Sequence, residues 1–269
     1  MTELLIRNKS RYGWVPDLPD HRDRVFTRLC EQFGHLPPTV DLRPGMPLVY
    51  NQGRIGSCTA NAICGAFEFD LRKQNIHDFM PSRLFVYFNE RSIEGSTPYD
   101  AGAQIRDGVK TIATLGICSE AEWPYDDTPA DSDGVFPSDA RAGQRPDERC
   151  YSDARYNEAV VYERVAQSLA HIKSTLANGF PVVFGFTVFS SFETPEVASS
   201  GIVPMPQSCD QALGGHAVVL TGYNDTKQRF LVRNSWGDIW GMTGYFTLPY
   251  SYVTNPQLAS DFWVVRRVS

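Results

Sequence analysis

A cysteine at the start of a predicted helix is the first residue in the chain that could act as a nucleophile. Cys58 follows Ser57, a residue type that often caps helices, and apolar residues recur with helical spacing at Ala60, Ile63 and Phe67. Unpaired backbone N–H groups and the positive end of the helix dipole stabilise a thiolate in the first turn and lower its pKa. The local sequence also allows a second interpretation, in which Cys58 is an inert buried thiol.

A thiol nucleophile needs a base, and one histidine stands in a suitable setting. His216 begins an apolar stretch and follows Gly214 and Gly215, which leave space for a bulky apolar substrate side chain. Asn234 and Trp236 follow the next predicted strand, where an amide could orient the imidazole and an indole could shield it. A lone histidine is more often structural, so the catalytic interpretation of His216 depends on these two neighbours.

The predicted secondary structure that would position these groups changes from mainly helical in the first half of the chain to mainly strands in the second. Residues 41–125 are predicted to be mainly helical, and residues 126–148 form a polar loop. Helices are predicted at 57–75, 82–91, 105–115 and 165–177, and strands at 181–189, 216–223, 229–233, 244–248 and 262–267. A helical half followed by a strand-rich half predicts an α+β protein of two lobes with a ligand site between them.

Composition and charge argue against several classes of protein. The 269 residues are 42% hydrophobic and 21% charged, which is typical of a packed globular chain. The net charge of −6 gives no basic footprint for nucleic acid, and no apolar run approaches the roughly 18 residues that span a bilayer. Histidines and cysteines show no metal-ligand spacing, so we expect neither a metal nor another cofactor. No signal peptide is visible, which leaves the compartment undetermined.

Three sequence blocks together resemble the papain family of cysteine peptidases, most closely its bacterial members with a short N-terminal extension. The blocks are Gln52-Gly53 with Gly56-Ser57-Cys58, then Gly215-His216-Ala217-Val218, then Asn234-Ser235-Trp236-Gly237 with Trp240-Gly241 and Gly244-Tyr245. The resemblance runs from about Val40 to the C-terminus. The histidine and asparagine follow the cysteine at more than the about 130–150 residues of papain-type enzymes, and loops at 126–148 and 190–215 could supply the extra length.

The resemblance implies a fold, a division of the chain and an activity. The fold would be papain-like α+β, with a helical left lobe at about 41–130, a β-barrel-like right lobe at about 150–269, and the active site in the cleft between them. Residues 1–40 would be an N-terminal extension or short prosegment, and residues 41–269 the catalytic domain. The activity would be that of a monomeric cysteine endopeptidase that hydrolyses peptide or protein substrates without a cofactor.

The family motifs imply roles for individual residues. Cys58 would be the nucleophile, and His216 would be its base and later the acid that protonates the leaving amine. Asn234 would hold the imidazole in position, and Trp236 would cover their contact. The Gln52 side chain and the Cys58 backbone N–H would form the oxyanion hole. The residues expected to bind substrate are Gly102, Ala103, Gly215 and Trp236.

Three positions depart from the family pattern. The family's local signature is C-G-[SA]-C-[WY], and here Ile55 replaces its first cysteine and Thr59 its aromatic residue. The usual partner of that first cysteine falls at Asp100, so we predict that this disulfide is missing. The sequence does not determine the redox state of the other cysteines, which are Cys30, Cys64, Cys118, Cys150 and Cys209.

The N-terminal arm, residues 1–40, is too short for the family's usual helical propeptide. It contains Trp14 and several prolines, which favour extended backbone. We hypothesise that the arm lies in the cleft and blocks the site; the alternative is that it braces the two lobes. Two other functions remain open, namely an inactive or self-inhibited binding scaffold and an acyl transferase that uses the same Cys–His pair. Transglutaminase-like relatives have Asp as the third group, so Asn234 argues for the peptidase.

Overall fold

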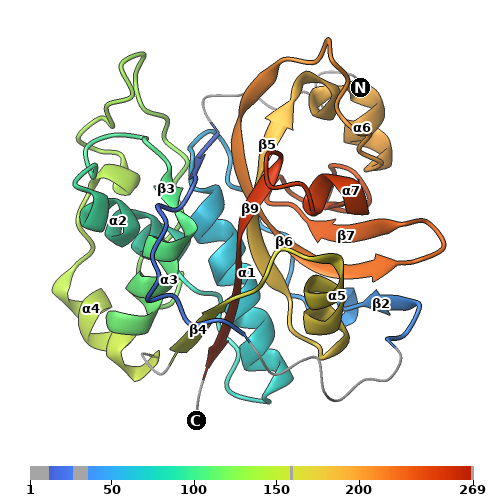
Figure 1. The fold of residues 1–269 in the computed structure, drawn as a ribbon. Coiled ribbons are helices and arrows are strands. Elements are labelled where there is room, and N and C mark those ends of the chain that lie inside the picture. The colour runs from blue at the N-terminus through green and yellow to red at the C-terminus, as the bar shows by residue number, and fades with distance from the viewer. Residues whose placement is uncertain (1–11, 27–35, 158–159, 268–269) are drawn as a thin grey trace.

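A computed structural model describes residues 12–26, 36–157 and 160–267, with helices gathered on one side and strands on the other (Figure 1). The helical side carries α1 (Cys58–Lys73), α2 (Arg83–Glu94), α3 (Ile105–Thr114) and α4 (Glu148–Ala154). The other side carries β4 (Val160–Arg164), β5 (Val182–Phe189), β6 (Ala212–Asn224), β7 (Arg229–Arg233), β8 (Tyr245–Pro249) and β9 (Ala259–Arg267). Three short helices accompany these strands, α5 (Leu169–Ala177), α6 (Pro195–Ser200) and α7 (Tyr250–Val253).

The strands form one antiparallel sheet in the order β4-β9-β5-β6-β7-β8, and β2 (Thr39–Asp41) pairs with β6 beside this path. The prediction of an α+β architecture is confirmed. The described part of the sheet ends at β4 and β8 without closing, so the strand-rich side is an open sheet rather than the barrel-like lobe that we expected. Among the described residues, no helix is both long and apolar enough to cross a bilayer.

Helix α1 is the central element, because it packs against α2 and α3 on one side and against β6 and β9 on the other. Every residue from Cys58 to Leu71 is buried. The apolar residues with helical spacing predicted only one buried face, whereas the structure buries all faces of this part of the helix. The predicted start is confirmed, but the Ser57 side chain makes no capping hydrogen bond. Its hydroxyl instead lies 2.5 Å from Tyr125 Oη and accepts from Asn61 Nδ2 at 3.0 Å.

Local hydrogen bonds decide where two other helices begin. Helix α2 begins at Arg83, one residue after the predicted start, because Ser82 caps it: Ser82 Oγ accepts from the Phe85 N–H at 3.2 Å. The helix predicted from residue 165 begins later, at Leu169, because the Ser168 hydroxyl caps it and Val165 still pairs with Phe262 as extended chain. Strand β4 and the short helices α4 and α6 were not predicted, because each has too few residues for a clear periodic pattern.

Candidate active site

Cys58 and His216 come from opposite sides of the molecule and meet where α1 faces β6. Cys58 is the first residue of α1, and His216 lies in β6 opposite Phe186 of β5. Both side chains are fully buried. The backbone N–H of Ala217, the residue after the histidine, donates to Cys58 Sγ at 3.4 Å. The sequence-predicted nucleophile and base therefore lie together at the junction of the helices and the sheet.

Asn234 determines which nitrogen of His216 carries the proton. His216 Nε2 lies 2.8 Å from Asn234 Oδ1, and the same oxygen accepts from the Ser235 backbone N–H at 2.9 Å. Because a backbone N–H can only donate, the Asn234 atom in this contact is the carbonyl oxygen, and Nε2 must be the donor to it. In the neutral imidazole the other nitrogen, Nδ1, is then the basic one.

Aromatic rings enclose the imidazole. The Trp236 ring stacks on His216 with centroids 5.1 Å apart and an interplanar angle of 30°. Phe186 meets the imidazole edge-on at 5.8 Å, and Tyr12 of the N-terminal arm does so at 6.2 Å. Trp236 thus lies against the histidine on one face of the imidazole.

Gln52 is buried and held from both sides of the molecule. Its Oε1 accepts from Ser235 Oγ at 2.7 Å, and its backbone N–H donates to the Ser235 carbonyl at 2.8 Å. Its Nε2 donates to the Ile55 carbonyl at 3.0 Å. A side-chain amide has two N–H groups, so these contacts fix the orientation of the amide while engaging one of them.

A carboxylate joins the two segments that the family disulfide would link. Asp100 accepts from the Gly56 N–H at 2.9 and 3.1 Å and from Tyr87 Oη at 2.5 Å. None of the five cysteines in the described ranges forms a disulfide. Thr59, the other departure from the family pattern, donates to Glu90 Oε1 at 2.6 Å, and burial raises the pKa of Glu90 well above its ordinary value.

The described part of the arm lies along the predicted substrate-binding edge, and Figure 1 shows it in dark blue beside β3 and α3. Strand β1 (Trp14–Val15) pairs in parallel with β3 (Ala103–Gln104), and the Ala103 N–H donates to the Gly13 carbonyl at 2.8 Å. Gly13 approaches so closely that a Cβ there would lie 1.6 Å from the Gly56 carbonyl oxygen. Of the predicted substrate-binding residues, Gly102, Ala103 and Gly215 contact this arm.

Asp17 anchors the arm behind β1. Its buried carboxylate accepts from the Arg106 backbone N–H at 3.0 Å, from Trp263 Nε1 at 2.8 Å and from Arg164 Nη2 at 3.2 Å. Its own N–H donates to Asp261 Oδ2 at 2.8 Å. Burial first, and then the neighbouring Asp261 carboxylate, raise the pKa of Asp17 to about 6. Sequence reasoning missed this anchor, since nothing in the chain pairs Asp17 with residues so far away.

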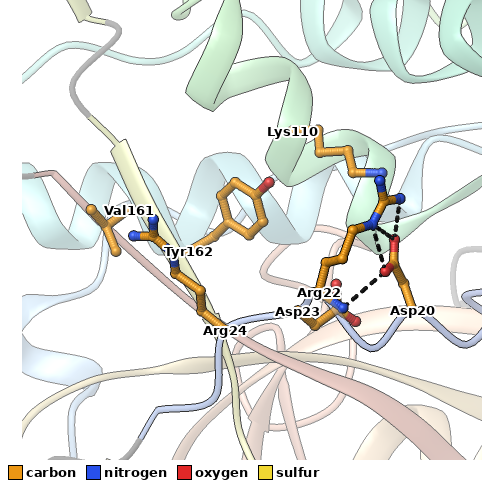
Figure 2. A pocket seen from close by; sticks show the side chains of 7 residues that line it. All are labelled: Asp20, Arg22, Asp23, Arg24, Lys110, Val161 and Tyr162. Atoms are coloured by element: carbon orange, nitrogen blue, oxygen red, sulfur yellow. Dashed lines mark hydrogen bonds and ion pairs between the residues drawn. The ribbon is translucent and has the colours of Figure 1, made fainter.

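The arm continues to a second attachment. Arg106 donates to Asp23 from Nε at 3.0 Å and from Nη2 at 2.6 Å, a two-pronged ion pair that is almost completely buried. Beside it lies a cavity of about 520 Å³ that contains neither Cys58 nor His216 (Figure 2). The cavity is lined by Asp20, Arg22, Asp23, Arg24, Lys110, Val161 and Tyr162. No group of three or more side chains suited to a metal ion occurs in the residues that the structure describes.

Comparisons with known proteins agree with this geometry. The sequence pattern of the papain family cysteine proteases matches residues 36–262. The chain is 40% identical, over 293 aligned residues, to an uncharacterized peptidase C1-like protein of Acanthamoeba polyphaga mimivirus, and the match covers 100% of this chain and 89% of the viral protein.

Solved structures show the same relationship. The crystal structure of xylellain, a cysteine protease from Xylella fastidiosa, is similar with a TM-score of 0.92 and 48% identity over 98% of both chains. A digestive procathepsin L 3 of the Tenebrio molitor larval midgut shares the fold, with a TM-score of 0.68 and 19% identity over 100% of this chain and 78% of that one. The chain belongs to the papain family of cysteine peptidases. It is therefore a hydrolase of clan CA, with the papain-like fold that the sequence motifs implied.

Proposed function

We propose that this protein is a cysteine endopeptidase in which Cys58 attacks the peptide carbonyl and His216 moves the proton. The observation that carries the proposal is the His216 Nε2–Asn234 Oδ1 hydrogen bond of 2.8 Å, which leaves Nδ1 as the basic nitrogen of an imidazole whose neighbour in the chain, Ala217, contacts the buried Cys58 thiol. The position of Cys58 at the start of α1 supports the same assignment, because the helix terminus favours a thiolate.

The reaction then follows in two halves. His216 Nδ1 takes the proton of the Cys58 thiol, and the sulfur forms a bond to the substrate carbonyl carbon. The imidazolium returns that proton to the leaving amine as the C–N bond breaks, which leaves an acyl group on sulfur. His216 then removes a proton from water, which attacks the acyl carbon, and the acid product and the thiol are released. Asn234 keeps the ring oriented throughout these proton transfers.

The oxyanion would be stabilised by two N–H groups. The first would be the Cys58 backbone N–H, which lies in the first turn of α1 at the positive end of the helix dipole. The second donor would be the Nε2 hydrogen of Gln52 that is not directed at Ile55. Each such donor contributes most when negative charge develops on the substrate oxygen, since both sit in a buried, preorganised setting.

We also propose that the arm inhibits the enzyme from within the cleft. The support is positional, because Gly13 and Trp14 cover Gly56, Gly102 and Gly215, where a substrate backbone would have to lie. The arm also bridges the two sides of the molecule, since Asp17 contacts Arg106 of α3 and Trp263 of β9. In this one position the arm would both block the cleft and connect the helical side to the strand-rich side.

A thiol-directed epoxide and a peptide substrate test the catalytic assignment. We expect stoichiometric labelling at Cys58 when the arm is displaced, and loss of both labelling and hydrolysis in Cys58→Ala with an unchanged melting temperature. A folded protein with a displaced arm that is never labelled would instead be a binding scaffold. Labelling accompanied by amine transfer in preference to hydrolysis would identify an acyl transferase.

Removal of residues 1–35 tests the inhibitory arm. This cut keeps β2, which pairs with β6, and so preserves the sheet. We expect faster hydrolysis than in the full chain, provided that circular dichroism shows the same fold. Equal activity of the folded truncation and the full chain would leave bracing as the only role of the arm.

A further inference from the structure

The segment of residues 51–57, all of which the structure describes, leads from Gln52 to the nucleophile without forming a helix or a strand. Two of its N–H groups bind outside the segment, since Gln52 donates to the Ser235 carbonyl and Gly56 donates to Asp100. Its carbonyl groups also need donors, because a buried backbone carbonyl without one costs free energy. Those donors come from other elements.

Tyr125, which lies between α3 and α4, supplies one of these donors. Its hydroxyl donates to the Gln52 carbonyl at 3.0 Å and lies 2.5 Å from Ser57 Oγ. A phenol has one proton, and here Gln52 accepts it, so the Ser57 hydroxyl is the donor in the second contact. Burial raises the pKa of Tyr125, so the phenol keeps the proton that the bond to Gln52 requires.

Asn61 of α1 extends these hydrogen bonds to Arg83 of α2. Arg83 Nη1 donates to Asn61 Oδ1 at 3.3 Å, and Asn61 Nδ2 donates to Ser57 Oγ at 3.0 Å. Because a guanidinium can only donate, the Asn61 atom that faces it is the oxygen, and the Asn61 nitrogen is left for Ser57. The hydrogen bonds therefore run in one direction, through Arg83, Asn61, Ser57, Tyr125 and finally the Gln52 carbonyl.

Glu120 holds Arg83 and Tyr125 together. Glu120 Oε1 accepts from Arg83 Nη2 at 2.5 Å and from the Tyr125 backbone N–H at 3.2 Å. The guanidinium carbon of Arg83 lies 3.9 Å from the centroid of the Tyr125 ring, which is a cation–π contact. Arg83 also donates to the Asn51 carbonyl at 3.3 Å. The charged pair thus supports both the tyrosine and the residue before Gln52.

This arrangement restrains the backbone of Gln52. The Arg83 and Glu120 side chains are 6% and 15% exposed, so water screens their attraction little. Hydrogen bonds that run in one direction polarise one another, and the first donor here carries a full charge. The position of the Gln52 backbone determines where its side-chain amide lies relative to Cys58, and a displacement of about 1 Å in a reacting site can cost about 10²-fold in rate.

We propose that Tyr125 is a positioning residue for the oxyanion donor Gln52, and that the Arg83–Glu120 pair holds Tyr125 in place. The inference rests on the proposed endopeptidase function. Tyr125 acts through the Gln52 carbonyl and the Ser57 hydroxyl rather than on the substrate. Loss of its hydroxyl should therefore slow the chemical step and leave substrate binding nearly unchanged.

Hydrogen exchange tests whether Tyr125 restrains the segment, and it does not require activity. In the full-length Cys58→Ala chain we expect Tyr125→Phe to lower protection of the Gln52 amide by about tenfold, the effect of one lost hydrogen bond. Tyr223→Phe is the matched control, because the Tyr223 hydroxyl also donates to a backbone carbonyl, that of Pro37, at 2.7 Å. Equal protection of the Gln52 amide in all three chains would overturn the positioning role.

Peptide hydrolysis by the full chain tests whether this restraint serves the reaction. Tyr125→Phe should lower kcat by about tenfold with little change in KM. In a Gln52→Ala background the same substitution should cause almost no further loss, because Tyr125 acts through the amide that is already absent. Every variant carries the same arm, so the effect of the arm on the apparent KM is common to all.

Arg83→Lys tests the ion pair while keeping its charge. A lysine cannot reach Glu120, Asn61 and Asn51 at once, so we expect kcat to fall less than in Tyr125→Phe but in the same way, with no further loss in the Gln52→Ala background. A loss of equal size in both backgrounds would mean that the pair only stabilises the fold. Melting temperatures of all variants control for folding.

The outcomes separate the two proposals. A Tyr125→Phe chain with unchanged kcat, or with the same loss in both backgrounds, would overturn the positioning role and leave the endopeptidase intact. A folded chain with a displaced arm that neither cleaves peptides nor reacts at Cys58 would overturn the proposed function, and the role of Tyr125 in it.

Discussion

At the scale of single residues, the site depends on hydrogen bonds that orient the side chains of His216 and Gln52. Asn234 uses its carbonyl oxygen on His216 Nε2, so Nδ1 is the basic nitrogen of the neutral imidazole. Gln52 uses its oxygen on Ser235 and one N–H on Ile55, and we propose that its second N–H binds the substrate oxygen. In both amides, hydrogen bonds to neighbouring groups fix the orientation of the side chain.

Gln52→Glu tests the oxyanion role. The carboxylate keeps the acceptor for Ser235 but loses the N–H donors, so we expect kcat for peptide hydrolysis to fall by about 10²–10³-fold with a smaller change in KM. Ser235→Ala is the matched control, because it removes the hydroxyl that orients Gln52 and leaves the donors, and it should cost less. A Gln52→Glu enzyme with kcat near that of the unaltered protein would exclude Gln52 from the oxyanion hole.

At the scale of elements, buried polar contacts hold segments that relatives of the family link covalently. Asp100 binds the loop before α1 through the Gly56 N–H and binds α2 through Tyr87. A hydrogen-bonded carboxylate of this kind does not depend on an oxidising environment, because no sulfur is involved. Thr59 and Glu90 form a second buried link between α1 and α2.

Asp100→Ala tests this link by leaving a buried N–H and a buried hydroxyl without their acceptor. We expect the free energy of unfolding to fall by about 3 kcal/mol, measured by urea denaturation. Tyr87→Phe removes only one of the hydrogen bonds and should cost about 1 kcal/mol. An unchanged denaturation midpoint in Asp100→Ala would show that the carboxylate does not stabilise the junction of the loop and α2.

The attachment of the arm should depend on pH. The pKa of Asp17 is about 6 in the docked arm, above the roughly 3.9 of a free aspartate, so the docked form holds more protons between these values. Asp261, Arg164, Arg106 and Trp263 face this carboxylate, and burial raises the pKa of Asp261 as well. Docking is therefore favoured at acidic pH and is weakened as the pH rises through about 6.

Hydrogen exchange can measure this effect at the Ala103 amide, which donates to Gly13. In a Cys58→Ala chain, which cannot cleave itself, we expect protection of this amide to fall by about tenfold from pH 5 to pH 7 after correction for intrinsic exchange. Asp17→Asn, which stays uncharged, should show a flatter profile. Protection that rises with pH in the unaltered arm would contradict the sign of this linkage.

At the scale of the whole molecule, the helical and strand-rich sides share a core. Trp263 and Val265 of β9 belong to the same buried cluster as Leu84 of α2 and Ile112 of α3, and α1 packs on both sides. Gln52 and Ser235 tie the two sides together at the active site. A second apolar cluster lies within the sheet, around Phe184, Phe186 and other residues of β5 to β8.

This shared core predicts cooperative unfolding. We expect calorimetry of the Cys58→Ala chain to show one transition whose calorimetric and van't Hoff enthalpies agree, because neither side can lose its packing on α1 alone. Two resolved transitions would show that the sides fold independently and that the α1 interface contributes little to stability.

The sequence by itself determined the residue types and the local periodicity, and with them the candidates Cys58, His216 and Asn234, most helices and strands, and the family. These features depend on neighbours in the chain or on short motifs. Only the tertiary structure decided that Asp100 forms hydrogen bonds to both segments that a disulfide would link, that Asp17 anchors the arm, and that Trp14 packs against Gly215. Each of these depends on burial and on partners far away in sequence, and the strength of a buried polar or apolar contact depends on which groups the fold brings together.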